Sequence, residues 1–179
     1  GWLGWRPPIR STAQREMVRG AVGDNEPWQR LTGIEPRSLS DALAAEPASV
    51  QERWFASLYL LKPLAVAVFS AFWIGTGLIS LGPGWDIGKG LMFEGGVEDP
   101  LASLVVIAGA LSDLVIGIAV AFRRTTRAGL YAALAISIAY TIIGTLLVPR
   151  LWADPLGPML KIWPIMAFNL LLLAIHRDR

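Results

Sequence analysis

The stretch PLAVAVFSAFWIGTGLISL (63–81) carries no charge and is long enough to cross a lipid bilayer. A helix rises about 1.5 Å per residue, so roughly 20 apolar residues cross a hydrocarbon core of about 30 Å. Three more stretches have such a length and at most one charge each: PLASLVVIAGALSDLVIGIAVAF (100–122), AGLYAALAISIAYTIIGTLLVP (128–149) and PLGPMLKIWPIMAFNLLLLAI (155–175). The sequence therefore predicts an all-α polytopic membrane protein, a four-helix transmembrane bundle. We expect spans at about 61–81, 101–122, 128–148 and 156–175.

The composition agrees with a membrane protein and narrows its chemistry. Hydrophobic residues make up 54% of the 179 residues and charged residues 17%, a balance too apolar for the surface of a soluble domain. The chain has no cysteine and a single histidine, His176, so the usual ligands of iron–sulfur clusters, haem and zinc are missing. We expect no metal and no cofactor held by this chain itself. The ligands that remain open are a quinone and structural lipids. We expect no nucleic-acid partner.

The distribution of positive charge predicts an orientation. Arg123, Arg124 and Arg127 fill the short turn between the second and third spans, and two more arginines follow the fourth span. The loop 82–100 is acidic on balance. Because loops rich in lysine and arginine stay in the cytoplasm, both chain ends and the arginine turn are expected on the cytoplasmic side. The expected location is the inner membrane of a bacterium.

Residues 1–52 differ from the rest and are expected to form a small helical cytoplasmic arm, ahead of a transmembrane domain at 53–179. A helix is predicted from Ser11 to about Arg19, where Gly20 can end it. Ser49 and Glu52 have the spacing of a capping box, in which each side chain accepts a hydrogen bond from the backbone of the other residue. The helix that they open is expected to continue into the first span.

Three motifs together resemble the DoxX-like family of small membrane proteins: GALSDLVIG (109–117), RRTTR (123–127) and LWADPLGPMLKIWPI (151–165). The segments GWRPPIRSTAQREMVRGAVGDNEPW (4–28) and ASVQERWFASLYLLKPLA (48–65) resemble the junction in proteins that carry an NAD(P)-binding, short-chain-dehydrogenase-like domain ahead of such a module. The resemblance implies a DoxX-like membrane domain. The dehydrogenase-like catalytic domain is absent from this sequence, which has neither a glycine-rich phosphate loop after a strand nor a Tyr-x-x-x-Lys pair.

Asp113 is the most informative polar residue of the spans. It precedes Arg123 by ten residues, which places it about 15 Å from the cytoplasmic boundary, near the middle of the bilayer. A carboxylate facing lipid there costs several kcal/mol, so we expect it to face the bundle interior. Gly109 and Gly117 share its helix face and allow a second helix to approach closely. The candidate partners at comparable depth are Ser137, Tyr140, Thr141 and Asn169. The site is either a structural hydrogen bond or a group that handles protons or quinone.

The remaining positive charges have plainer expected roles. Lys62 and the three arginines of the turn are expected to be interfacial anchors, with long stems in the apolar region and charged heads in the headgroups. Lys161, between two prolines, and the nearby Trp163 are candidates for contact with a lipid or quinone headgroup. An anchor is the alternative role for Lys161.

Two functions from different classes follow. The first is an accessory or anchoring subunit without catalytic groups of its own, which contacts lipids and protein partners in a larger membrane or oxidoreductase complex. The alternative is a quinone-binding component of a DoxX-type oxidoreductase system, with quinone near Asp113, Tyr140 and Lys161. The second rests on analogy with DoxX relatives.

Overall fold

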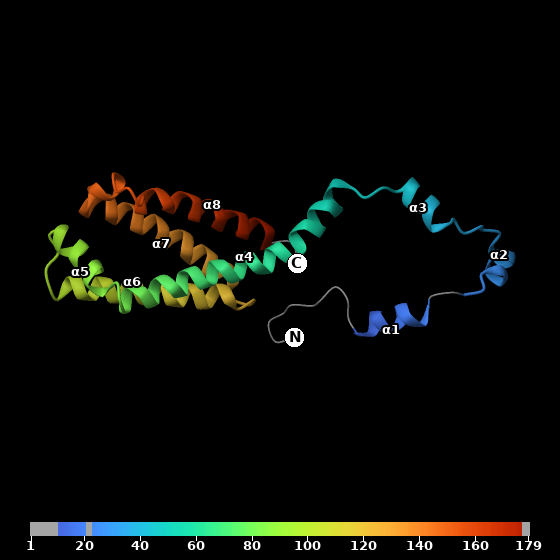
Figure 1. The fold of residues 1–179 in the computed structure, drawn as a ribbon, viewed down its shortest axis with the longest axis horizontal. Helices are drawn as coiled ribbons and strands as arrows, with labels where there is room; N and C mark the ends of the chain where they lie inside the picture. The colour runs from blue at the N-terminus through green and yellow to red at the C-terminus, as the bar shows by residue number, and fades with distance from the viewer. Residues whose placement is uncertain (1–10, 21–22, 177–179) are drawn as a thin grey trace. The chain divides into compact units, whose positions relative to one another are not determined.

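The computed structural model describes residues 11–20 and 23–176, with the side chain of Ser11 outside that description. Its elements are α1 (Ser11–Arg19), α2 (Glu26–Thr32), α3 (Leu39–Ala45), α4 (Val50–Leu81), α5 (Trp85–Glu94), α6 (Leu101–Ala121), α7 (Thr126–Leu147), the 3-10 turn η1 (Pro149–Trp152) and α8 (Pro158–His176), as Figure 1 shows. Four of these helices, α4, α6, α7 and α8, are long and apolar enough to cross a membrane. The predicted all-α membrane fold is confirmed.

The first span is longer than its apolar stretch because its helix begins earlier. The backbone N–H of Ser49 donates to Glu52 Oε2 over 2.6 Å, and the N–H of Glu52 donates to Ser49 Oγ over 3.2 Å. This is the predicted capping box, and the helix it opens runs for 32 residues to Leu81. The other three spans begin and end within two residues of the predicted bounds.

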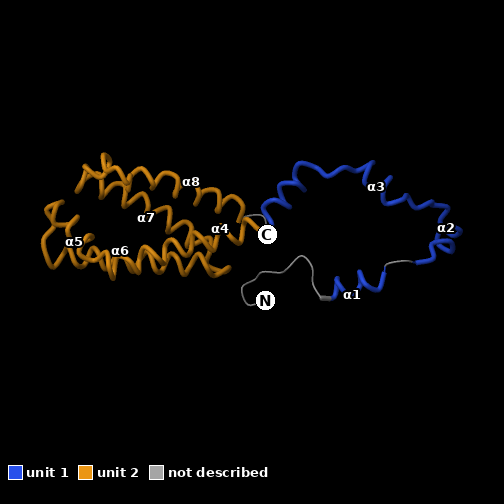
Figure 2. Tube along the Cα trace, viewed as in Figure 1, with its two compact units in different colours: residues 1–59 blue, residues 60–179 orange. Residues whose placement is uncertain are grey.

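The chain divides into two compact units, residues 1–59 and residues 60–179 (Figure 2). In the first unit α1 ends at Gly20, as predicted, and Gly20 takes a φ of +77° that favours glycine. Neither α2 nor α3 contains a buried residue. Leu31 is 88% exposed and Leu39 is 77% exposed. The helices of this unit therefore have apolar side chains without a core to hold them.

In the second unit α4 and α6 cross with their backbones close together. A Cβ added to Gly117 would lie 2.8 Å from the backbone nitrogen of Ile74 and 2.9 Å from the carbonyl oxygen of Ser70. The Ser70 hydroxyl uses this closeness and donates to the carbonyl oxygen of Gly117 over 2.7 Å. About two helical turns away, Gly77 of α4 gives the same room to the backbone of Ala110 of α6. Small residues thus set the distance between these two helices.

The other helices complete the bundle around α7. Gly129 admits the backbone of Val120, so α6 and α7 are also close-packed. α8 packs against α7, and its C-terminal end meets α4 at Lys62, whose ammonium donates to the carbonyl oxygen of Ile175. The buried core shared by the four helices consists of Phe69, Trp73, Ile116, Val120, Leu130, Ala133 and Leu172.

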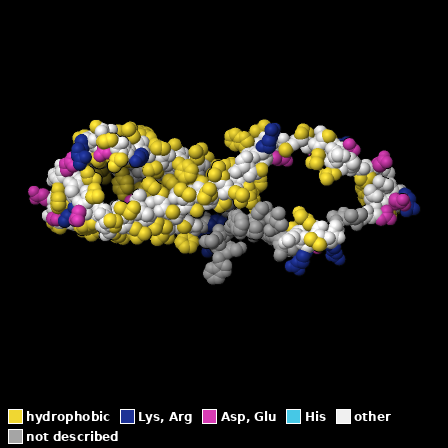
Figure 3. Space-filling view, in the orientation of Figure 1, with side chains coloured by type: hydrophobic (Ala, Val, Ile, Leu, Met, Phe, Trp, Pro, Cys, Tyr) yellow, Lys and Arg dark blue, Asp and Glu magenta, His cyan; other side chains and the backbone are white. Residues whose placement is uncertain are grey.

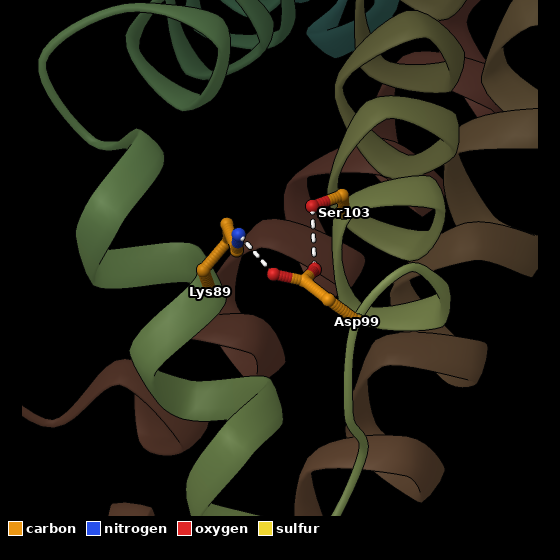
Figure 4. A network of polar contacts seen from close by, with 3 residues as sticks. All are labelled: Lys89, Asp99 and Ser103. Atoms are coloured by element: carbon orange, nitrogen blue, oxygen red, sulfur yellow. Dashed lines mark hydrogen bonds and ion pairs between the residues drawn. The ribbon is translucent and has the colours of Figure 1, made fainter.

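The end of the second unit that carries α5 and η1 is held by two ion pairs. Lys89 Nζ lies 2.5 Å from Asp99 Oδ2, and the other oxygen of this carboxylate accepts a hydrogen bond from Ser103 over 2.7 Å (Figure 4). Arg150, in η1, makes a two-pronged ion pair with Glu94 at the end of α5. Each of these carboxyl groups has a pKa below its usual range, because its basic partner donates a hydrogen bond to it.

Candidate intramembrane polar site

The centre of the bundle holds a carboxylate and a phenol side by side. Asp113 is only 6% exposed on α6, and the Tyr140 hydroxyl of α7 lies 2.9 Å from its Oδ1 atom. The same hydroxyl lies 3.3 Å from the carbonyl oxygen of Gly109. Gly109 leaves room for this hydroxyl, because a Cβ on it would lie 3.1 Å from the Tyr140 oxygen, a tight contact. Two of the residues expected at this site are thus brought together, and Asp113 faces the bundle interior as expected.

A threonine of a third helix lies close to this pair. The Thr76 side chain of α4 is near the Asp113 carboxyl, and its hydroxyl donates to the carbonyl oxygen of Trp73 over 2.9 Å. Thr76 was not among the residues predicted for this site, although it is the only threonine of the stretch 63–81. The hydrogen bond between Asp113 and Tyr140 therefore joins α6 to α7 in an apolar environment, with Thr76 of α4 nearby.

The other expected members of the site make separate contacts. The Ser137 hydroxyl donates to the carbonyl oxygen of Ala133 and the Thr141 hydroxyl to that of Ser137, both within α7 over 2.8 Å. Asn169 is buried on α8 and donates from Nδ2 to the carbonyl oxygen of Leu130 over 2.9 Å. Leu130 precedes Tyr140 by ten residues, which is about 15 Å along a helix. Asn169 thus joins α8 to α7 by a hydrogen bond at a different depth in the bundle from the Asp113–Tyr140 pair.

Two buried polar atoms lack a hydrogen-bond partner in the described part of the chain: the indole Nε1 of Trp73 and the amide Oδ1 of Asn169. Trp73 is 3% exposed and packs edge-on against the rings of Phe69 and Phe72. It stands one helical turn before Thr76 on α4, so this buried donor without an acceptor lies in the same stretch of the bundle.

The residues expected at the membrane boundaries are on the surface or at helix ends. Lys161 is exposed and Trp163 is 55% exposed on α8, whereas Asp113 is buried. Lys62 is partly buried and caps the C-terminal end of α8, so it fixes two helices to one another in addition to lying near the boundary. Arg123 and Arg124 are exposed in the turn between α6 and α7, and Arg127 is exposed in the first turn of α7.

The chemistry of the site is that of hydrogen bonds and protons. A carboxyl, a phenol and a hydroxyl can hold a polar group of a ligand or exchange a proton among themselves. Within the described residues, no group of three histidine, cysteine or acidic side chains is arranged to hold a metal ion.

Comparison with known proteins places the membrane bundle in a family. The sequence pattern of the DoxX-like family matches residues 70–170, which is more than half of the 179 residues and includes Asp113, Tyr140 and Asn169. No curated protein and no solved structure matches the chain. The matched region begins within α4 and ends within α8, so it covers all of α6 and α7. The chain belongs to the DoxX-like family of membrane proteins.

Proposed function

We propose that this protein is an accessory or anchoring module of a larger membrane complex, held in the bilayer by four helices and attached to a protein partner by its N-terminal arm. The arm is residues 1–52, of which the structure describes residues 11–20 and 23–52. In this proposal both chain ends lie in the cytoplasm and the bilayer is a bacterial inner membrane, as the positive-inside rule favours.

The observation that carries the proposal is that the helices of the arm are short and have exposed apolar side chains. Its helices are 9, 7 and 7 residues long, and isolated helices shorter than about 12–15 residues are marginal in water. Large apolar side chains on them are exposed, among them Val18, Leu31, Leu39 and Leu43. Such helices gain stability when their apolar side chains are covered. A partner protein supplies that cover in an accessory subunit, and Trp28, 46% exposed, is the kind of side chain that anchors such contacts.

The polar groups of the spans favour a structural role for the bundle. Asp113 is bonded to Tyr140, and Ser70, Thr76, Ser137, Thr141 and Asn169 all donate to backbone carbonyls. The bonds of Tyr140, Ser70 and Asn169 join two helices each and fix their register. The bonds of Thr76, Ser137 and Thr141 stay within one helix. The partner that the junction-like sequence of the arm implies is a soluble NAD(P)-binding oxidoreductase or a neighbouring subunit of a bioenergetic assembly.

Extraction of the full chain from its native membranes in a mild detergent tests the proposal. The wild type should migrate with a partner protein on a native gel, and identification of that band by mass spectrometry names the partner. Replacing Leu31 and Leu39 by aspartate should release the partner while the chain stays in the membrane. The matched control replaces Arg30 and Arg37, exposed neighbours on the same arm, by glutamine. A wild type that migrates alone contradicts the proposal.

The second candidate, a quinone-binding component, is favoured by the buried N–H of Trp73, which has no acceptor in the described part of the chain. A quinone carbonyl is an acceptor that this donor lacks. Here the protein purified in mild detergent should carry extractable quinone, and both Trp73→Phe and Asp113→Asn should lower its amount. If the bonds of Asp113 are structural, Asp113→Asn leaves the quinone content unchanged. Quinone that co-purifies with a chain running alone would favour this candidate over the first.

A further inference from the structure

The basic side chains at the two ends of the membrane unit differ in whether they form ion pairs with acidic side chains. At the end that carries α5 and η1, Lys89 is paired with Asp99 and Arg150 with Glu94. Figure 3 shows basic and acidic side chains side by side at this end. These cations have counter-ions within the chain and need none from outside.

The arginine turn, residues 123–127, has no such balance. From residue 60 to residue 176, the acidic residues are Asp86, Glu94, Glu98, Asp99, Asp113 and Asp154. All of them belong to the α5 end or to the bundle interior, and none lies in the turn. Among the described residues, Arg123, Arg124 and Arg127 make no ion pair. Within the part of the chain that the structure describes, these three guanidinium groups have no anionic partner.

The turn is built to hold these arginines in place. The Thr125 hydroxyl donates to the carbonyl oxygen of Ala119 over 2.8 Å, and the Thr126 hydroxyl donates to that of Val120 over 3.1 Å. These two bonds close the C-terminal end of α6 and fix the path of the chain into α7. Thr126 is buried, so the turn is anchored in the bundle while its arginines are exposed.

The surroundings of the turn are those of a membrane interface. The guanidinium carbon of Arg127 lies 5.8 Å from the centre of the Tyr131 ring, one turn into α7. Phe122, which precedes the arginines, is 62% exposed. Aromatic side chains at the end of a span lie at the level of the lipid headgroups, and the arginines beside them lie at the same level. The nearest abundant anion at that level is a lipid phosphate.

We propose that the arginine turn is a binding site for the phosphate headgroup of an anionic phospholipid. Arginine suits this ligand because its planar guanidinium donates two parallel hydrogen bonds to phosphate oxygens. A basic residue near an anionic leaflet changes the affinity by roughly fivefold. The lipid supplies the negative charge that the turn lacks, at the end of the bundle where α6 and α7 meet.

Native mass spectrometry of the full chain tests the site, with protein released from vesicles of equal parts phosphatidylglycerol and phosphatidylcholine. The wild type should retain phosphatidylglycerol in preference to phosphatidylcholine. Replacing Arg123, Arg124 and Arg127 by glutamine should reduce that preference at least tenfold, because each arginine is expected to contribute roughly a factor of five. Replacement of the same three by lysine keeps the charge but loses the paired hydrogen bonds, and should give an intermediate preference.

The matched control replaces Arg19, Arg30 and Arg37 of the arm by glutamine, which changes the net charge by the same amount. It should keep the preference of the wild type. Circular dichroism in detergent checks that each variant retains its helices, and single glutamine variants of the turn replace the triple variant if it does not. Equal retention of both lipids by the wild type overturns the proposal. So does a control that loses as much phosphatidylglycerol as the turn variant.

Discussion

The polar residues of the spans are arranged by what each can bond within the reach of its side chain. The Ser137 and Thr141 hydroxyls reach a carbonyl one turn back on α7, so both are satisfied within their own helix. The Ser70 hydroxyl of α4 reaches Gly117 of α6 only because these two backbones lie close together. Tyrosine is long enough to cross to the next helix, and Tyr140 therefore reaches Asp113 on α6. The sequence placed these residues at a common depth. Which of them meet depends on helix rotation, which depth alone does not determine.

The bond from Tyr140 to Asp113 gives the first prediction. Replacing Tyr140 by phenylalanine removes the hydroxyl and leaves the buried carboxyl with fewer donors, so the free energy of unfolding should fall by about 1–3 kcal/mol. The measurement is unfolding of the protein in detergent by added denaturant. Ser112→Ala is the matched control, because the Ser112 hydroxyl donates only to the carbonyl of Ala108 in its own helix. A Tyr140→Phe protein as stable as this control would show that the interhelical bond contributes nothing.

At the scale of helices, the glycines of α6 have different partners. The shared face of Gly109 and Gly117 correctly predicts close approach of other helices. In the structure Gly117 contacts the backbone of α4, and Gly109 contacts the Tyr140 side chain of α7. Two partners use one face because the successive turns of α6 meet different helices. Spacing predicts that a face is packed, whereas the identity of the neighbour comes from the whole bundle.

The crossing of α4 and α6 gives a prediction with a built-in control. Gly117→Ala would place a methyl group against the backbone of Ile74 and Ser70, which a side-chain rotation does not relieve. Overpacking of this kind costs about 1–3 kcal/mol.

The control is Gly75, which lies on α4 next to Ile74 and has no atom within 4 Å of an added Cβ. Gly75→Ala should be neutral or slightly stabilising, by up to about 1 kcal/mol, because alanine is the better helix former. Denaturant unfolding of both variants in the same detergent measures the difference. Equal effects would mean that α4 and α6 are not close-packed at Gly117.

The ion pair between Lys89 and Asp99 predicts how α5 responds to acid. The pKa of Asp99 in the folded protein is lowered by the Lys89 hydrogen bond and then by that of Ser103. A lowered folded-state pKa stabilises the fold at every pH above the ordinary aspartate pKa of about 3.9, and this contribution is lost as the pH falls through the lower folded-state value. The amides of residues 85–94 should keep their hydrogen-exchange protection, corrected for intrinsic rates, from neutral pH to about pH 4.

In Lys89→Gln the Asp99 pKa returns toward its ordinary range, so protection of the same amides should be lower at neutral pH and less dependent on acid. High salt should weaken protection in the wild type and have less effect on the variant, since both partners of the pair touch solvent. Identical exchange in the two proteins across this pH range would show that the pair does not hold α5.

At the scale of the whole molecule, the sequence predicted the number, type and bounds of the spans well, because length and apolar composition determine them directly. The capping box at Ser49 was equally readable, since it is a local pattern of two side chains. The contacts of Lys62 with α8 and of Arg150 with α5 were not predicted. They join residues more than fifty positions apart, and their partners are fixed only when the helices are packed.

Orientation in the membrane is the last property that the charge pattern predicts. The chain has no cysteine, so single cysteines can be introduced without a background. Arg124→Cys reports on the arginine turn and Glu98→Cys on the opposite end, and both positions are exposed. In intact bacterial cells a membrane-impermeant maleimide should label the cysteine at 98 and not the one at 124, because positively charged turns remain in the cytoplasm. After the inner membrane is permeabilised, both should react, which controls for reactivity. Labelling of position 124 alone in intact cells would contradict the orientation predicted from the charges.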